Sequence, residues 1–172
     1  SNAGEGDDAI DGGNANDTIN GDEGDDIING GAGADIIDGG EGDDIIATDG
    51  LDTIDGGIGY DTLILDAGVS LNFDNVQNLS NIEEIDLSTT GANNILNLSL
   101  QDVIAMTDSN NDLKITGDSA DSVTFKDGTG TDAWSTNSTV TEGGKTFDVY
   151  TNTEDTSVQV KVEQPISDGI TN

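Results

Sequence analysis

Residues 21–47 read GDEGDDIIN, GGAGADIID and GGEGDDIIA, three nine-residue blocks that each carry an aspartate two positions before an aliphatic residue. The same spacing continues on both sides of this stretch. The aliphatic residues recur at intervals of 9, 9, 9, 9, 8 and 9, at Ile10, Ile19, Ile28, Ile37, Ile46, Ile54 and Leu63. The aspartates that precede them are Asp8, Asp17, Asp26, Asp35, Asp44, Asp52 and Asp61. A fixed period of this length predicts a solenoid of stacked coils.

Each block combines a turn with a short strand. The glycine pairs allow the positive φ angles and the close backbone approach that a six-residue turn needs. The three residues after the turn are expected to form a strand whose aliphatic member points inward. A single block can neither bury that side chain nor complete the shell of a metal ion, so neighbouring blocks have to stack.

The composition restricts the functions that are open to the chain. Of its 172 residues, 36 are acidic and 4 are lysine, and the formal charge is −32. Four scattered lysines cannot form a surface for nucleic acid or for an anionic membrane. The chain has no cysteine and no histidine, which excludes the usual zinc sites and histidine-based catalysis. The remaining oxygen donors favour hard cations, above all Ca²⁺.

The blocks resemble the nonapeptide G-G-x-G-x-D-x-U-x of the RTX, or haemolysin-type, calcium-binding family, where U is a large aliphatic residue. The resemblance implies an all-β fold, a right-handed parallel β-roll with two repeats per coil. It also implies that Ca²⁺ lies between turns i and i+2 on the same side of the roll. In that arrangement the sixth-position aspartate and backbone carbonyls of the turns supply the ligands.

On this chain the resemblance implies two ranks of metal-binding aspartates and about five sandwiched calcium sites. One flank carries Asp8, Asp26, Asp44 and Asp61, and the other carries Asp17, Asp35 and Asp52. The turn at 48–52 is one residue shorter than the others, which places its own site in question. Acids at the fifth and ninth positions are open to two interpretations, as solvated outer residues or as direct ligands. They are Asp7, Asp25, Asp43, Asp11 and Asp38.

Charge and glycine content change near residue 66. Residues 4–66 hold 19 acidic residues, 16 glycines and no lysine, whereas 67–172 hold 17 acidic residues, 8 glycines and all four lysines. Residues 1–3, Ser-Asn-Ala, are interpreted as a tag remnant. We therefore expect a calcium-binding β-roll over 4–66, the repeat region, and a C-terminal β-rich cap over 67–172.

The cap shows strand-like alternation of apolar and polar residues and one helical segment. Strands are predicted at 69–73, 82–87, 95–98, 113–116, 123–125, 146–150 and 158–162. A short helix is predicted within 99–107, where Ser99 and Asp102 form a capping pair. We expect the cap to cover the strand edges at the end of the roll. Its aromatic core candidates are Phe73, Trp134, Phe147 and Tyr150.

A second, less specific resemblance covers 61–166. The succession DTLIL, NIEEIDLS, ANNILNLSLQDVIAMTD and DLKITGDSADSV, followed by strands bearing Trp and Tyr, resembles the C-terminal end of large type-I-secreted bacterial RTX adhesins. This resemblance implies an uncleaved type I secretion signal near 158–172.

Two smaller motifs also contain possible calcium ligands. Residues 127–132, DGTGTD, fit x-G-x-G-x-D but have no partner turn, so they are open as a plain loop or a sixth calcium site. Residues 108–112, DSNND, begin like an EF-hand loop, but Leu113 and Ser119 occupy the positions that require glycine and glutamate. We therefore interpret 108–112 as a polar turn. Isolated calcium binding at Asp118 or Asp121 stays open.

These features favour a noncatalytic calcium-binding module that folds on export to the calcium-rich exterior. It would support type I secretion and extracellular stability of a large adhesin involved in cell adhesion and biofilm. The alternative is the C-terminal RTX secretion module of a secreted enzyme, a lipase, protease or epimerase, whose catalytic domain is absent here. The expected partners are calcium ions and the type I secretion machinery, with no nucleic acid and no membrane insertion. We expect a monomer that is secreted or held at the bacterial cell surface.

Overall fold

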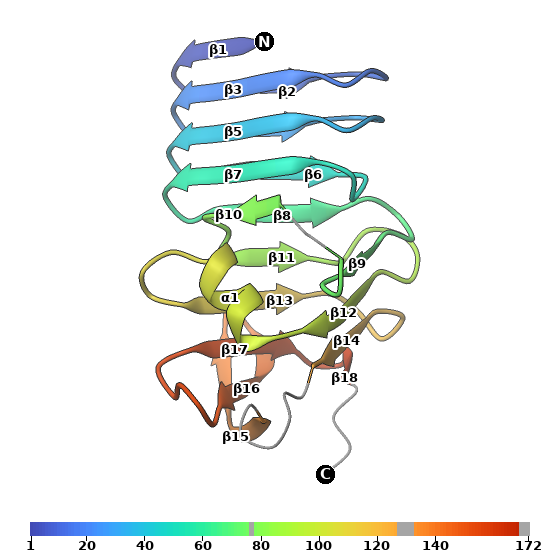
Figure 1. Ribbon diagram of the computed structural model, residues 1–172, viewed down its shortest axis with the longest axis vertical. Coiled ribbons are helices and arrows are strands. Elements are labelled where there is room, and N and C mark those ends of the chain that lie inside the picture. Colours follow the sequence, from blue (N-terminus) through green and yellow to red (C-terminus); the bar gives the residue numbers. More distant parts are fainter. Residues whose placement is uncertain (76–77, 127–132, 169–172) are drawn as a thin grey trace.

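The computed structural model describes residues 1–75, 78–126 and 133–168. Its strands lie across the longest axis of the molecule, with the N-terminus at one end of that axis and β15 near the other (Figure 1). The strands of the repeat region are β1 (Asn2–Glu5), β2 (Ala9–Asp11), β3 (Thr18–Glu23), β4 (Ile27–Asn29), β5 (Ile36–Glu41), β6 (Ile45–Thr48), β7 (Thr53–Ile58) and β8 (Thr62–Leu65).

The cap continues with ten strands and one helix among the described residues. They are β9 (Ser70–Asn72), β10 (Asn78–Ser80), β11 (Glu84–Asp86), β12 (Asn94–Leu98), α1 (Leu100–Met106), β13 (Asp112–Thr116), β14 (Ser122–Phe125), β15 (Trp134–Glu142), β16 (Lys145–Asn152), β17 (Gln159–Glu163) and β18 (Ser167–Asp168).

Successive repeats place their strands alternately in two sheets. The first sheet has the order β1-β3-β5-β7-β10, and the second runs β2-β4-β6-β8-β11-β13-β17-β16-β15. Ile19 pairs with Ile37 and Ile37 with Ile54, so every second repeat lies in register. Two repeats therefore make one coil, and pairing within the repeats is parallel throughout. The predicted all-β fold with a parallel β-roll and one short helix is confirmed.

The repeated aliphatic residues form the core of the roll. From Ile19 to Leu63 all six are at most 2% exposed, while Ile10, near the chain start, is partly buried. The residue before each of them points outward, and Ile27, for example, is 57% exposed. The period of nine thus maintains one buried aliphatic residue per strand.

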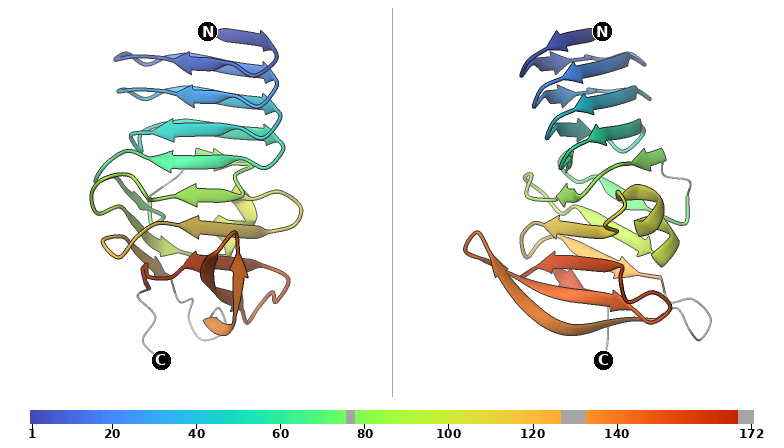
Figure 2. Two further views of the ribbon diagram at one scale, coloured as in Figure 1. Left: turned by 180° about the vertical axis from the view of Figure 1, so that it is seen from behind. Right: turned by 90° about the vertical axis from the view of Figure 1, so that its left-hand side faces the viewer.

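Strand pairing continues across the boundary at residue 66, from the repeat region into the cap. β10 pairs in parallel with β7, and β11 pairs in parallel with β8. A third sheet, β9-β12-β14-β18, begins at this level, and the coils become longer (Figure 2). The first strands of the cap therefore satisfy the backbone groups at the end of the repeats, as the capping interpretation requires. The division into two domains at residue 66 stays a prediction.

The cap contains the expected helix and an aromatic cluster. Ser99 is the N-cap of α1, and its capping box with Asp102 is complete. Phe147 and Tyr150 are fully buried and Trp134 is 5% exposed. The rings of Phe125 and Trp134 lie 5.1 Å apart. Phe73 packs against the core while partly buried.

Four strands were not predicted from the sequence, namely β1, β10, β15 and the two-residue β18, which pairs with β14. β1 includes Asn2 and Ala3, which were interpreted as a tag remnant, and Asn2 pairs with Asn20. β10 is short and mostly polar. β15 is rich in serine and threonine, because it forms the edge of the second sheet and pairs on one side only, with β16. Within the described residues no helix has the length and apolar character needed to cross a membrane.

Candidate metal centre

The sixth-position aspartates form two stacked ranks at the N-terminal ends of the strands. Each stands directly before a strand, so the stacking of parallel strands aligns the aspartates. Asp8, Asp26, Asp44 and Asp61 precede β2, β4, β6 and β8. Asp17, Asp35 and Asp52 precede β3, β5 and β7. The structure thus brings together the two sets expected from the spacing, and their role as metal ligands stays a prediction.

A ladder of hydrogen bonds connects the members of each rank. The backbone N–H of each aspartate donates to Oδ1 of the aspartate one coil later. The donor and acceptor pairs are Asp8 and Asp26 (2.8 Å), Asp26 and Asp44 (2.8 Å), Asp44 and Asp61 (2.9 Å), Asp17 and Asp35 (2.8 Å), and Asp35 and Asp52 (2.9 Å). Each carboxylate therefore fixes the turn of the preceding coil.

The second carboxylate oxygen of four of these residues is buried without a partner. Within the described parts of the chain, Oδ2 of Asp26, Asp35, Asp44 and Asp61 has no hydrogen-bond donor. These four side chains are at most 1% exposed. A buried carboxylate that lacks a positive partner is strongly destabilising, because its lost hydration is not replaced.

Carbonyl oxygens face these unpaired atoms across a space that only glycine leaves open. A Cβ built on Gly21 would lie 2.3 Å from Oδ2 of Asp26 and 2.1 Å from the carbonyl oxygen of Gly39. At Gly39, the corresponding distances are 2.4 Å to Oδ2 of Asp44 and 2.3 Å to the carbonyl oxygen of Gly56. Two electron-rich oxygens therefore border the same small space in successive turns.

This donor set suits Ca²⁺, which takes carboxylate and carbonyl oxygens in flexible numbers. Among the residues that the structure describes, no group of three or more acidic side chains gathers in the manner of a metal site. Backbone carbonyls would therefore have to complete each shell, as the resemblance to the RTX repeats implies. The sixth-position aspartates and the glycine carbonyls are the groups that would hold the ion.

Burial also changes the acidity of these groups. Desolvation, together with the charges of neighbouring aspartates, raises the pKa of Asp44 to about 6. Desolvation, with Asp44 and Glu83 nearby, raises the pKa of Asp61 to about 7. Both carboxylates are thus held in a site that disfavours their charge.

The shortened turn at 48–52 differs from the others in two ways. Oδ2 of Asp52 accepts a hydrogen bond from Oγ1 of Thr48 at 2.6 Å. At Gly30, the built Cβ would lie 2.6 Å from Oδ2 of Asp35, but the other two nearest atoms are carbons rather than a carbonyl oxygen. At this turn, therefore, no carbonyl oxygen is among the three atoms nearest the built Cβ, and Oδ2 of Asp52 already has a hydrogen-bond donor. This is the turn whose calcium site the sequence placed in question.

We expect Asp35→Ala to raise the calcium midpoint of folding more than Asp52→Ala. Asp35 has an unpaired oxygen that a cation would neutralise, whereas the oxygen of Asp52 already accepts from Thr48. Calcium titrations followed by circular dichroism measure both midpoints. Equal or reversed shifts would show that the register of the sites is wrong.

The fifth-position acids form a separate, exposed ladder. Oδ1 of Asp7 accepts from the backbone N–H of Asp25, and Oδ1 of Asp25 accepts from that of Asp43. These bonds run in the opposite direction to those of the sixth-position rank. The contacts favour an outer role for the fifth position. Of the ninth-position acids, Asp11 and Asp38 are both exposed, and burial and Asp55 raise the pKa of Asp38.

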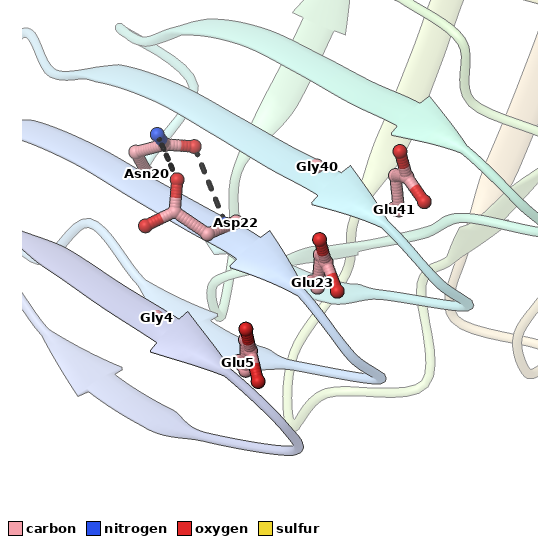
Figure 3. A pocket seen from close by; sticks show the side chains of 7 residues that line it. All are labelled: Gly4, Glu5, Asn20, Asp22, Glu23, Gly40 and Glu41. Carbon is pink, nitrogen blue, oxygen red and sulfur yellow. Dashed lines mark hydrogen bonds between the residues drawn. The ribbon is translucent and has the colours of Figure 1, made fainter.

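The first sheet also stacks glutamates near its strand ends. Glu5, Glu23 and Glu41 lie in register on β1, β3 and β5 (Figure 3). Beside them, Asn20 and Asp22 form two hydrogen bonds of 2.6 and 3.3 Å. Like charges directly opposite one another in a sheet are destabilising. This column therefore adds to the repulsion that the repeat region has to overcome.

The smaller motifs of the cap have local roles. Asp108 accepts from the backbone N–H of Asn110 at 2.7 Å, as expected for a polar turn. Both carboxylate oxygens of Asp121 accept backbone N–H groups, from Asn93 and from Asp118. The possible sixth calcium site at 127–132 lies outside the described residues.

Sequence reasoning missed Glu83. This residue is 7% exposed and accepts from the backbone N–H of Asp61 at 2.9 Å, so it takes the next place in the rank. The available signal was its position two residues before Ile85, which is buried as the repeat aliphatics are. No glycine-rich turn precedes Glu83, and this absence concealed the pattern.

The comparison with protein-family models agrees with the repeat assignment. The family model for the RTX calcium-binding nonapeptide repeat (4 copies) matches residues 2–19, 11–46 and 46–69. No curated protein matches the chain. Among solved structures, the chain is similar to the solution structure of the AlgE6R3 subunit from the Azotobacter vinelandii mannuronan C5-epimerase. That similarity has 20% sequence identity and a TM-score of 0.29, and it covers 95% of this chain and 76% of the other.

Proposed function

We propose that the chain, in which residues 2–69 match the family model for RTX calcium-binding nonapeptide repeats, is a noncatalytic module whose folding depends on calcium. The module remains expanded inside the cell and folds on reaching the calcium-rich exterior. There it supports type I secretion and the extracellular stability of a larger adhesin.

The observation that carries this proposal is the row of buried carboxylate oxygens without donors. The repeat region has 19 acidic residues and no lysine. The lysines form ion pairs with acids beyond the repeats, namely Lys114 with Glu84, Lys126 with Asp74, Lys145 with Glu163 and Lys161 with Glu142. The charge of the roll therefore has to be neutralised by ions from solution.

The free energy of calcium binding is large enough to make folding depend on whether the chain lies inside or outside the cell. Extracellular sites bind Ca²⁺ with a Kd of about 10⁻⁴–10⁻³ M. At a tenfold excess over Kd, each independent site adds about 1.4 kcal/mol to the free energy of unfolding, so five sites add about 7 kcal/mol. This is comparable to the whole stability of a typical domain, about 5–15 kcal/mol. Where free calcium lies far below Kd, the contribution is close to zero.

Export of a passenger tests the secretion role. We expect a passenger fused ahead of this chain to reach the medium through a bacterial type I exporter, and deletion of 158–172 to abolish its export. The matched control is Ile115→Asp, which places a charge at a fully buried position of β13 and leaves 158–172 intact. That variant should be exported but fail to fold. Export of the deletion variant, or retention of both variants, would contradict the proposed role of 158–172.

A further inference from the structure

The rank that contains Asp61 continues beyond the repeats. The backbone N–H of Asp61 donates to Oε2 of Glu83 at 2.9 Å, just as that of Asp44 donates to Oδ1 of Asp61 at 2.9 Å. Glu83 lies outside the stretch that the family model matches, which ends at residue 69. A residue of the cap therefore occupies the position of a repeat aspartate.

A shorter turn explains why this residue is glutamate. Asp55 pairs with Ser80, and Thr62 pairs with Glu84. Six residues, 56–61, lie between Asp55 and Thr62, whereas three residues, 81–83, lie between their partners Ser80 and Glu84. Three residues cannot form the wide repeat turn, so the carboxylate reaches the Asp61 amide on a side chain that is one methylene longer.

The short turn also replaces the repeat carbonyl. A Cβ built on Gly56 would lie 2.0 Å from the carbonyl oxygen of Asn81 and 2.7 Å from Oδ2 of Asp61. This is the arrangement found at Gly21 and Gly39. Asn81 has a φ of 51°, and its Nδ2 donates to Oδ1 of Asp55 at 2.7 Å, which holds the carbonyl in place.

Within the described parts of the chain, the carboxylates of Asp61 and Glu83 form no ion pair with a lysine. Asp61 is 0% exposed, and within the described residues its Oδ2 has no hydrogen-bond partner. Among the residues that the structure describes, the oxygens of Glu83 accept from two backbone N–H groups, those of Asp61 and, at 3.2 Å, of Asp108. The nearby lysines pair with other acids, Lys114 with Glu84 and Lys161 with Glu142.

We propose that Oδ2 of Asp61, the carbonyl of Asn81 and the carboxylate of Glu83 form a further Ca²⁺ site, one gap beyond the five of the repeats. Asp61 and Asn81 supply ligand oxygens, and Glu83 positions Asp61 and adds negative charge. The inference rests on calcium binding by the repeats and is independent of the proposed export role. Because its groups come from both sides of residue 66, ion binding here stabilises the cap on the roll.

Terbium luminescence gives a readout of the turn that contains Asp61. Tyr60 is the only tyrosine of the repeat region, and its hydroxyl donates to Oε2 of Glu84 at 3.0 Å. Tb³⁺, a luminescent substitute for Ca²⁺, should therefore show emission sensitised by Tyr60 that added Ca²⁺ reverses. The same titration of Tyr60→Phe supplies the background to subtract.

Glu83→Gln should raise the terbium midpoint of the Tyr60-dependent component about tenfold or more, the usual effect of losing a group that supports a metal ligand. Glu142→Gln is the matched control, because Glu142 lines the same cavity as Glu83 but pairs with Lys161. This control should leave the midpoint unchanged. Circular dichroism in saturating calcium shows whether each variant is folded.

Gly56→Ala provides a second test that keeps every charge. Its methyl group would occupy the space between Asp61 and Asn81, so equilibrium dialysis should find at least one bound calcium fewer than in the parent chain. An unchanged calcium count, or an unchanged Tyr60 component in Glu83→Gln, would overturn this site while leaving the repeat sites in place. Absence of all terbium and calcium binding by the parent chain would instead overturn calcium-dependent folding as a whole.

Discussion

Chelation of calcium with EGTA should unfold the repeat region, with loss of its β-sheet circular dichroism signal. Without an ion, the unpaired oxygens of Asp26, Asp35, Asp44 and Asp61 stay buried in a region that has no lysine. Withdrawal of about 7 kcal/mol of binding free energy removes most of a typical domain stability. Millimolar CaCl₂ should restore the signal. Magnesium should substitute poorly, because it requires tight octahedral geometry and retains its waters.

Acid should partly replace calcium in the same experiment. In the folded roll burial raises the pKa of Asp44 to about 6 and that of Asp61 to about 7, whereas an unfolded aspartate has a pKa of about 4. The folded chain therefore binds more protons in this window, and its free energy of unfolding in EGTA rises as the pH falls from about 7 to about 4. With calcium present the trend should reverse, because protons compete with the ion. An unchanged thermal midpoint after addition of EGTA at neutral pH would contradict the calcium-dependent folding of the repeat region.

Removal of residues 67–172 should have the second large effect. β7 and β8 would lose their pairing with β10 and β11, and Ile54, Leu63 and Leu65 would meet water. Exposure of each such side chain costs about 1.5–3 kcal/mol. A fragment of residues 1–66 should therefore stay unfolded at calcium concentrations that fold the full chain, as measured by circular dichroism.

Trp134 supplies the internal control for the truncation. It is the only tryptophan and lies in the cap, so its fluorescence reports on the cap alone. In the full chain its calcium midpoint should coincide with the circular dichroism midpoint. Two well-separated transitions, or a fragment that folds at the same calcium concentration as the full chain, would show that the cap and the repeat region fold independently.

The repeat region could be predicted from the sequence because its determinants are local. The position of each turn, strand and inward side chain follows from a nine-residue block, and stacking only repeats that block. Ile28 and Ile46 are fully buried and paired, as the period requires. The capping box of Ser99 and Asp102 was visible for the same reason, because its two partners are three residues apart.

The junction and the edge of the cap could not be predicted in this way. Glu83 acquires its role from Asp61, which lies 22 residues earlier, and from a short turn that no repeat pattern describes. β15 has few apolar residues, so its strand state depends on pairing with β16. At the junction, contacts between distant segments decide the local structure, whereas β15 is decided by its pairing across a hairpin with the next strand.

The amide-to-carboxylate hydrogen bonds of the sixth-position rank all run in one direction along the roll. In one rank Asp61 is held by Glu83, Asp44 by Asp61, Asp26 by Asp44 and Asp8 by Asp26. In this rank each turn is held by the turn that follows it in the chain, whereas in the exposed fifth-position ladder Asp7 holds Asp25 and Asp25 holds Asp43. We therefore expect the buried rank alone to become ordered from Glu83 towards the N-terminus. We expect loss of order in this rank to run the other way, from the turn of Asp8 towards Glu83, which belongs to the cap.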